Sequence, residues 1–288
     1  MTSAGGVPPP APFLEFRVDR LDVVPSVVGV CVGYEMQVWR CSGLAKHLLQ
    51  WLPEFALLYS ECAGLDAGSA VRRVGEAAAS IYNSDKFQRR GEFGEVLLHA
   101  VLRQRYRSIP LISKIYFKDS PNDTVKGFDA VHVVAGANGL ELWLGEAKFY
   151  ADIGTAMTEA VTSLKEHFNV DFLKREFVAI RRKIDPAQPL PDGVLRLFEP
   201  NVSLDTVIKS VHVPVLLTYN SETVAAHKDT SAPYVAAFER EVLAHRDTFA
   251  GKALPRNVIV HLLLIPLLDK DALVAEMHRC LKSAQDLI

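Results

Sequence analysis

The residues of this chain best suited to catalysis are an acid and a lysine separated by one position, Glu146 and Lys148. They form the only acidic-x-Lys triplet in the 288 residues, and the triplet directly follows the apolar run Leu140–Gly145. Seventeen residues before Glu146, Asp129 lies inside a second apolar run, Phe128–Val134. Burying such charges without a partner or a metal is unfavourable by several kcal/mol. The pattern therefore predicts that the three side chains meet in one site.

A turn between the two runs decides whether Asp129 reaches the triplet. Asn138 and Gly139 lie between the runs, and Asn-Gly between hydrophobic stretches is typical of a β-hairpin. A turn at 137–138 puts Asp129 opposite Glu146, whereas a turn at 138–139 puts it opposite Lys148. Because side chains alternate along a strand, both registers predict that the three side chains share one face.

Two carboxylates and a lysine suit phosphodiester hydrolysis assisted by a hard metal ion. Mg²⁺ takes oxygen ligands, usually one or two protein carboxylates and several waters, and Mn²⁺ accepts similar ligands. We expect Asp129 and Glu146 to bind the ion, with the carbonyl of Ala147 as a third ligand. The metal would activate a water and neutralise charge on the attacked phosphate, and Lys148 would hold the attacking water or the charged phosphorane. The alternative is a buried ion pair with a purely structural role.

An upstream helix offers a further acid. Apolar residues recur at helical spacing over 87–107, which predicts a helix that carries Glu92 and Glu95. Glu95 shares a face with Leu98, so we expect it to point toward the sheet, as a further metal ligand or to orient the metal's water. Glu92 lies closer to the helix start, where an acid complements the helix dipole. Which of the two glutamates belongs to the site stays open.

The elements that must position these residues alternate along the chain. Strands are predicted at 13–18, 27–34, 111–118, 126–135, 140–148, 211–219 and 257–265, and helices at 44–60 (broken near Pro53), 67–82, 87–107, 154–168, 169–183, 234–249 and 270–286. This alternation predicts an α/β fold with a mixed sheet covered by helices on both faces.

A polar stretch at 83–87 indicates a domain boundary. Residues 1–12 are rich in Pro, Gly and Ala, and we expect them to form a flexible tail. Residues 13–83 contain no recognisable set of catalytic or ligand residues. We interpret them as a smaller α+β region that binds a partner or regulates the rest of the chain. Residues 84–288 then form the nuclease domain.

The order of the elements resembles that of a known nuclease superfamily. A helix with Glu, a strand, a strand with Asp, a strand with Glu-x-Lys and a helix is the restriction-endonuclease-like, or PD-(D/E)xK, pattern. Within it, the segments Arg90–Glu95, Gly127–His132 and Gly145–Tyr150 resemble the C-terminal domain of the HamA family. The resemblance covers roughly residues 85–285.

The resemblance carries functional implications. It implies a DNA nuclease that serves as the effector of Hachiman antiphage systems, in a heterodimer with a HamB-like superfamily 2 helicase that restrains it. By this resemblance Asp129, Glu146, Lys148 and Glu95 are the catalytic residues. Two other functions stay open: a catalytically silent nuclease fold that binds DNA or a helicase, and a hydrolase of another phosphate ester.

The composition agrees with dependence on a partner. Hydrophobic residues make up 49% of the chain, enough for a large core, but the net charge of −2 is low for a protein that grips DNA alone. The nearest basic clusters lie at 174–183 and 89–107. We expect a cytoplasmic protein because no signal peptide or membrane span is predicted, and the four cysteines have no metal-ligand spacing. Without a Walker A motif, any unwinding of DNA must come from another protein.

Overall fold

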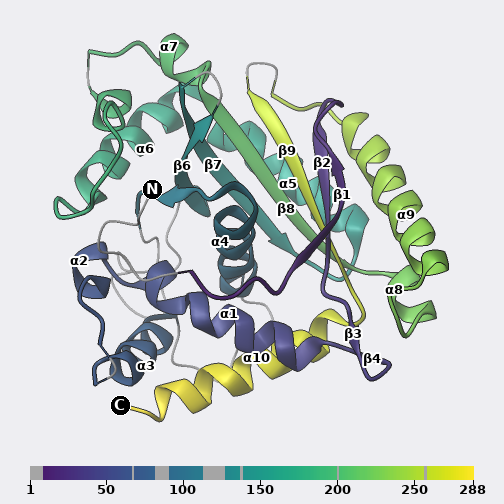
Figure 1. Cartoon of the computed structure of the whole chain (residues 1–288). Helices are drawn as coiled ribbons and strands as arrows, with labels where there is room; N and C mark the ends of the chain where they lie inside the picture. The colour runs from purple at the N-terminus through teal and green to yellow at the C-terminus, as the bar shows by residue number, and fades with distance from the viewer. Residues whose placement is uncertain are drawn as a thin grey trace.

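The centre of the molecule is a mixed β-sheet. The computed structural model describes residues 9–66, 68–81, 91–112, 127–136, 139–199, 201–255 and 258–288. Across these residues the sheet has seven strands in the order β1-β2-β9-β8-β7-β6-β5 (Figure 1). The strands are β1 (Glu15–Arg20), β2 (Ser26–Cys31), β5 (Ile109–Pro110), β6 (Ala130–Gly136), β7 (Gly139–Phe149), β8 (Val211–Asn220) and β9 (Ile259–Leu267). The short strands β3 (Tyr34–Glu35) and β4 (Val38–Trp39) pair separately.

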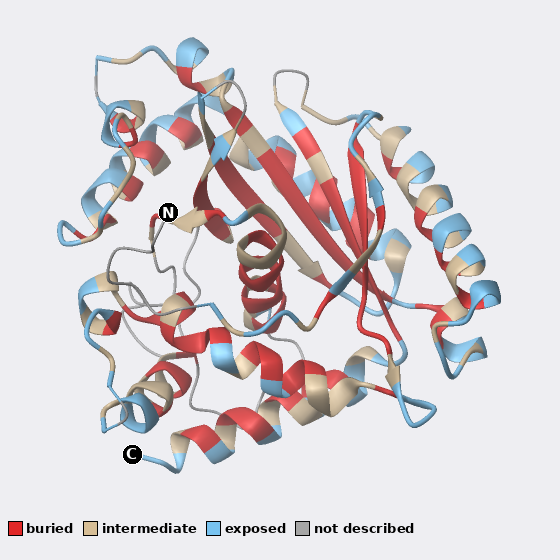
Figure 2. Cartoon of the chain, viewed as in Figure 1, coloured by how far each residue is buried: buried red, intermediate tan, exposed pale blue. Residues whose placement is uncertain are grey.

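The middle of the sheet is parallel and its two sides are antiparallel. Strands β2, β9, β8 and β7 run in one direction, while β1 pairs antiparallel to β2, β6 to β7, and β5 to β6. Figure 2 shows that the parallel strands are largely buried, as expected where helices cover both faces. The edge strand β1 contains a bulge between Phe16 and Val18.

Helices cover both faces of the sheet. They are α1 (Cys41–Ala56), α2 (Tyr59–Cys62), α3 (Ala70–Ile81), α4 (Glu92–Tyr106), α5 (Ile153–His167), α6 (Val170–Lys183), α7 (Leu204–Ile208), α8 (Glu222–Ala226), α9 (Ala232–Ala250) and α10 (Lys270–Gln285), with a 3₁₀ turn η2 (Leu195–Phe198). Helix α4 lies in front of the sheet and α5 behind it (Figure 1). Helices α1, α3 and α10 pack on one another, and α1 also packs on α4. The predicted α/β architecture with a helix-covered mixed sheet is therefore confirmed.

The hairpin of β6 and β7 has one of the two predicted registers. Ala130 pairs with Gly145 and Gly136 with Gly139, so Asp129, just before β6, lies opposite Glu146. This is the register expected for a turn at 137–138, although these two residues lie outside the described part of the chain.

Several boundaries differ from the prediction. Helix α1 continues through Pro53 to Ala56 instead of breaking there, because a proline in the last turn removes few of the helix's hydrogen bonds. Most of the strand predicted at 111–118 lies outside the described residues, and β5 ends at Pro110. Residues 13–83, predicted as a separate region, contribute β1 and β2 to the same sheet as the rest. Whether this region binds a partner stays a prediction.

A largely buried polar network links α1 to α4. The Glu54 carboxylate on α1 lies 3.0 Å from Nε2 of His99 and accepts a 2.8 Å hydrogen bond from Nε of Arg103, both on α4. Arg103 also donates to the carbonyl of Ser108, whose hydroxyl lies 2.7 Å from Nδ1 of His132 on β6. Burial acts to raise the pKa of Glu54, but His99 and Arg103 together hold that pKa below its usual range. The His99 imidazole is thus a packed, hydrogen-bonded group of the core.

Candidate active site

Backbone hydrogen bonds fix Asp129 beside the triplet. The Asp129 N–H donates to the carbonyl of Gly145 over 2.9 Å, and the N–H of Ala147 donates to Oδ2 of Asp129 over 2.8 Å. The first bond extends the ladder of β6 and β7 by one residue before the start of β6, and the second holds the Asp129 side chain against the backbone of β7. The structure therefore brings the predicted Asp129 and Glu146 together on neighbouring strands.

Glu146 is a buried carboxylate with a nitrogen-bearing side chain beside each oxygen. Its side chain is only 4% exposed, and Oε1 lies 2.9 Å from Nζ of Lys148. Oε2 lies 3.1 Å from Nδ1 of His167, the last residue of α5. The side chains of Lys148 and His167 are 17% and 16% exposed. The Glu146 carboxylate is thus shielded from water, while Lys148 and His167 are partly exposed.

The charges of this cluster stabilise one another. Burial acts to raise the pKa of Glu146, but the nearby His167 ring and the charge of Lys148 outweigh it, and the pKa lies below its usual range. Burial acts to lower the pKa of Lys148, yet the Glu146 carboxylate, with Asp129 adding to it, raises that pKa above its usual range. At neutral pH the site therefore holds a carboxylate and an ammonium group in contact.

The sequence did not reveal His167. Its ring stacks on Phe172 with centroids 4.7 Å apart and meets Phe128 edge-on at 5.1 Å, so aromatic side chains hold it toward Glu146. It is one histidine among nine, and nothing in its spacing distinguishes it. Its approach to Glu146 depends on how α5 crosses behind β7, a long-range feature that local patterns do not contain.

The predicted Glu95 lies in the first turn of α4, on the other side of the sheet. Gly94 packs so closely on β7 that an added Cβ would lie 2.9 Å from Cβ of Phe149. Because side chains alternate along β7, Phe149 points toward α4, whereas Glu146 and Lys148 point away from it. Glu95 is half-buried near this end of β7. Its role in the site, like that of Glu92, stays a prediction.

The oxygen ligands of the cluster suit a hard cation that is bound by only a few protein groups. Within the described ranges, no three His, Cys, Asp or Glu side chains gather closely enough to hold a metal ion. Mg²⁺ usually takes only one or two protein carboxylates and keeps several waters. Asp129, Glu146 and the carbonyl of Ala147 match that requirement. A metal there would share Glu146 with Lys148 and His167.

The predicted basic cluster at 174–183 lies on α6, the helix that follows His167. Lys174, Arg175, Arg181 and Arg182 are exposed there. The four cysteines are free thiols, and three of them are buried. No helix in the described segments is long and apolar enough to cross a bilayer.

Two comparisons relate the chain to known proteins. The model of the HamA family matches residues 12–281. Anti-bacteriophage protein A of Escherichia coli (strain K12) is 27% identical over 126 residues. This match covers 43% of the present chain and 23% of that protein, so it spans less than a quarter of the relative's length.

Proposed function

This chain belongs to the HamA family, and on that premise we propose that it is a metal-dependent DNA nuclease that acts in antiphage defence. The observation that supports the nuclease is the buried Glu146 carboxylate, set opposite Asp129 and in contact with Lys148. The name of the E. coli relative, an anti-bacteriophage protein, supports the role in defence. We further propose that the domain is restriction-endonuclease-like, since a helix with Glu95, the start of a strand with Asp129, a strand with Glu146 and Lys148, and a following helix, α5, occur in the order of that fold.

Each residue of the cluster has a proposed part in phosphodiester hydrolysis. Asp129, Glu146 and the Ala147 carbonyl would hold Mg²⁺ or Mn²⁺, which supplies Lewis-acid chemistry and a more acidic water. Lys148 keeps its charge at neutral pH and would stabilise negative charge that develops on the attacked phosphate. His167 would orient the Glu146 carboxylate through its contact with Oε2.

We expect DNA cleavage to require Mg²⁺ or Mn²⁺, because all proposed ligands are oxygens. Purified protein would be incubated with plasmid and with single-stranded DNA in Mg²⁺, Mn²⁺, Ca²⁺ or EDTA, and the products separated on gels. Cleavage should stop in EDTA, and Ca²⁺ should bind without supporting turnover. Cleavage at full rate in EDTA would rule out the metal-assisted mechanism.

We also propose that a superfamily 2 helicase, HamB-like and encoded beside this gene, loads and restrains the nuclease. This rests on the family resemblance and on the absence of a Walker A motif from the chain. Co-expression followed by size-exclusion chromatography should give a heterodimer whose activity on undamaged plasmid is lower than that of the nuclease chain alone. A chain that elutes alone and cuts all DNA freely would instead be a stand-alone nuclease.

A further inference from the structure

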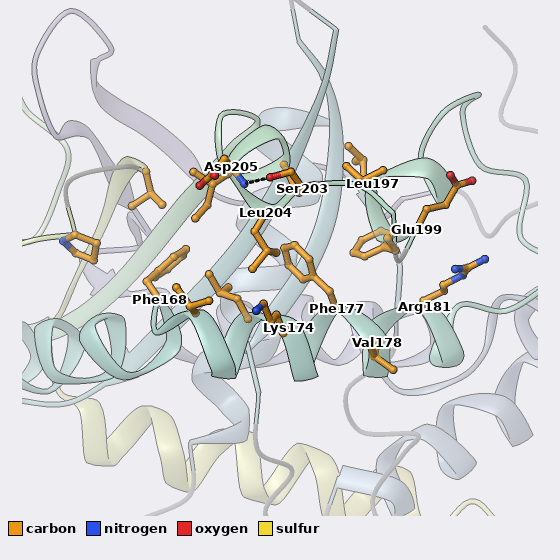
Figure 3. Close-up of a pocket in the computed structure, with 18 of the residues that line it drawn as sticks. Phe168, Lys174, Phe177, Val178, Arg181, Leu197, Glu199, Ser203, Leu204 and Asp205 are labelled. Atoms are coloured by element: carbon orange, nitrogen blue, oxygen red, sulfur yellow. Dashed lines mark hydrogen bonds between the residues drawn. The ribbon is translucent and has the colours of Figure 1, made fainter.

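A large groove lies between α6 and the described residues 197–199 and 202–208. Its volume is about 1150 Å³. Figure 3 shows α6 forming one wall, with η2 and α7 on the other. The interior is apolar, and its residues include Phe168, Leu173, Phe177, Leu197, Phe198 and Val207.

The α6 wall carries exposed apolar side chains where a charged helix face is the usual arrangement. Val170 is 57% exposed and Val178 is 50% exposed, and both line the groove. Lys174 lies midway between them on the same stripe of the helix, because residues four apart share a face. Exposed apolar side chains at the mouth of an apolar groove are typical of a binding surface.

The two walls carry opposite charges. Lys174, Arg181 and Arg182 line the groove from α6, whereas Glu199 and Asp205 line it from the opposite segment. A nucleic-acid strand in the groove would bring its phosphates near both acids. A polypeptide with an acidic flank and a basic flank would satisfy both walls at once.

We propose that this groove is a docking site for an amphipathic α-helix of a partner protein. The lining part of α6 spans residues 170–182, about 18 Å of helix, which matches a partner helix of roughly three turns. The apolar face of that helix would enter the groove, as in other helix-in-groove complexes. Its acidic flank would face Lys174 and Arg181, and its basic flank would face Glu199. The inference concerns binding and does not depend on the proposed nuclease activity.

Designed peptides test this proposal on the full chain. Both are fluorescein-labelled 16-residue helices with leucines on one face; the first has Glu along one flank and Lys along the other, and the second has Lys along both. Fluorescence anisotropy should show the first peptide binding at least about tenfold more tightly than the second. The comparison does not depend on the direction in which the helix lies, because the second peptide presents cations to α6 either way.

Two variants and a control locate the binding. Val178→Asp should lower the affinity for the first peptide at least about tenfold. Val71→Asp, at a 54% exposed valine on α3, should leave the affinity for that peptide unchanged. The double variant Lys174→Glu, Arg181→Glu should reverse the preference, so that the second peptide binds more tightly.

Five results would each overturn the proposal. The peptides could fail to bind, or bind alike, or bind Val178→Asp as well as the wild type. If a labelled single-stranded oligonucleotide binds the wild type but binds neither Val178→Asp nor the double variant, the groove would be assigned to nucleic acid. Self-association of the wild type that Val178→Asp abolishes would assign it to a second copy of the chain. Because none of these assays measures cleavage, their outcome is separate from that of the proposed function.

Discussion

Replacing Glu146 with glutamine is expected to lower the rate of DNA cleavage by about a thousandfold or more. The amide keeps the size of the side chain but removes its charge, so a metal ion would lose one of two carboxylates and Lys148 would lose its counter-charge. Lys148→Ala should have a similar effect, because it removes the one ammonium group within 3 Å of that carboxylate in the described site. Initial rates on labelled plasmid in Mg²⁺ measure both.

A matched substitution separates chemistry from folding. Glu159→Gln makes the same change at an exposed position of α5 and should cleave at the wild-type rate. The circular dichroism spectrum of Glu146→Gln should be that of the wild type, and its melting temperature should fall by no more than a few degrees, since the variant retains the shape of the side chain. If Glu146→Gln cleaves as fast as Glu159→Gln, the cluster of Glu146 and Lys148 is a structural ion pair and the active site lies elsewhere.

The second large effect concerns stability. Glu54→Ala is expected to lower the free energy of unfolding by about 3–5 kcal/mol, because His99 and Arg103 would remain in the core without their carboxylate. Glu76→Ala provides the comparison: Glu76, on α3, also pairs with two arginines, but its side chain is 31% exposed and that of Arg72 is 59% exposed. That change should lower the free energy of unfolding by less than about 1 kcal/mol.

Urea unfolding followed by circular dichroism measures both variants. The midpoint should fall clearly for Glu54→Ala and barely move for Glu76→Ala, with the same slope for each. Equal, small losses would mean that water reaches Arg103 and His99 once Glu54 is gone. The network would then add little to the attachment of α1 to α4.

The features that could be predicted from the sequence are local ones. Hydrophobic periodicity located the main helices and the parallel strands, and the Asn-Gly turn limited the β6–β7 hairpin to two registers. Either register put Asp129 on the same face as Glu146 and Lys148. The part of the candidate site that lies on this hairpin was therefore predictable.

The features that could not be predicted depend on contacts between distant segments. No local pattern indicates that β2 pairs with β9, although this pairing joins the N-terminal region to the same sheet. The contact between His167 and Glu146 requires α5 to cross β7 at a particular point, and the groove requires α6 to face residues 197–199 and 202–208. In each case the residues involved have ordinary neighbours in the sequence.

The two edges of the sheet limit how this molecule can associate with others. On β1, Arg17 pairs with Glu15 and Asp19 pairs with Arg105, and the bulge interrupts the regular spacing of free backbone groups. At the other side of the described sheet, β5 has two residues and ends at Pro110, which has no N–H to donate. Charged side chains, bulges and prolines on edge strands oppose the addition of a further strand. Lateral growth of the sheet into dimers or fibres is therefore disfavoured, and side-chain surfaces remain for recognition by other molecules.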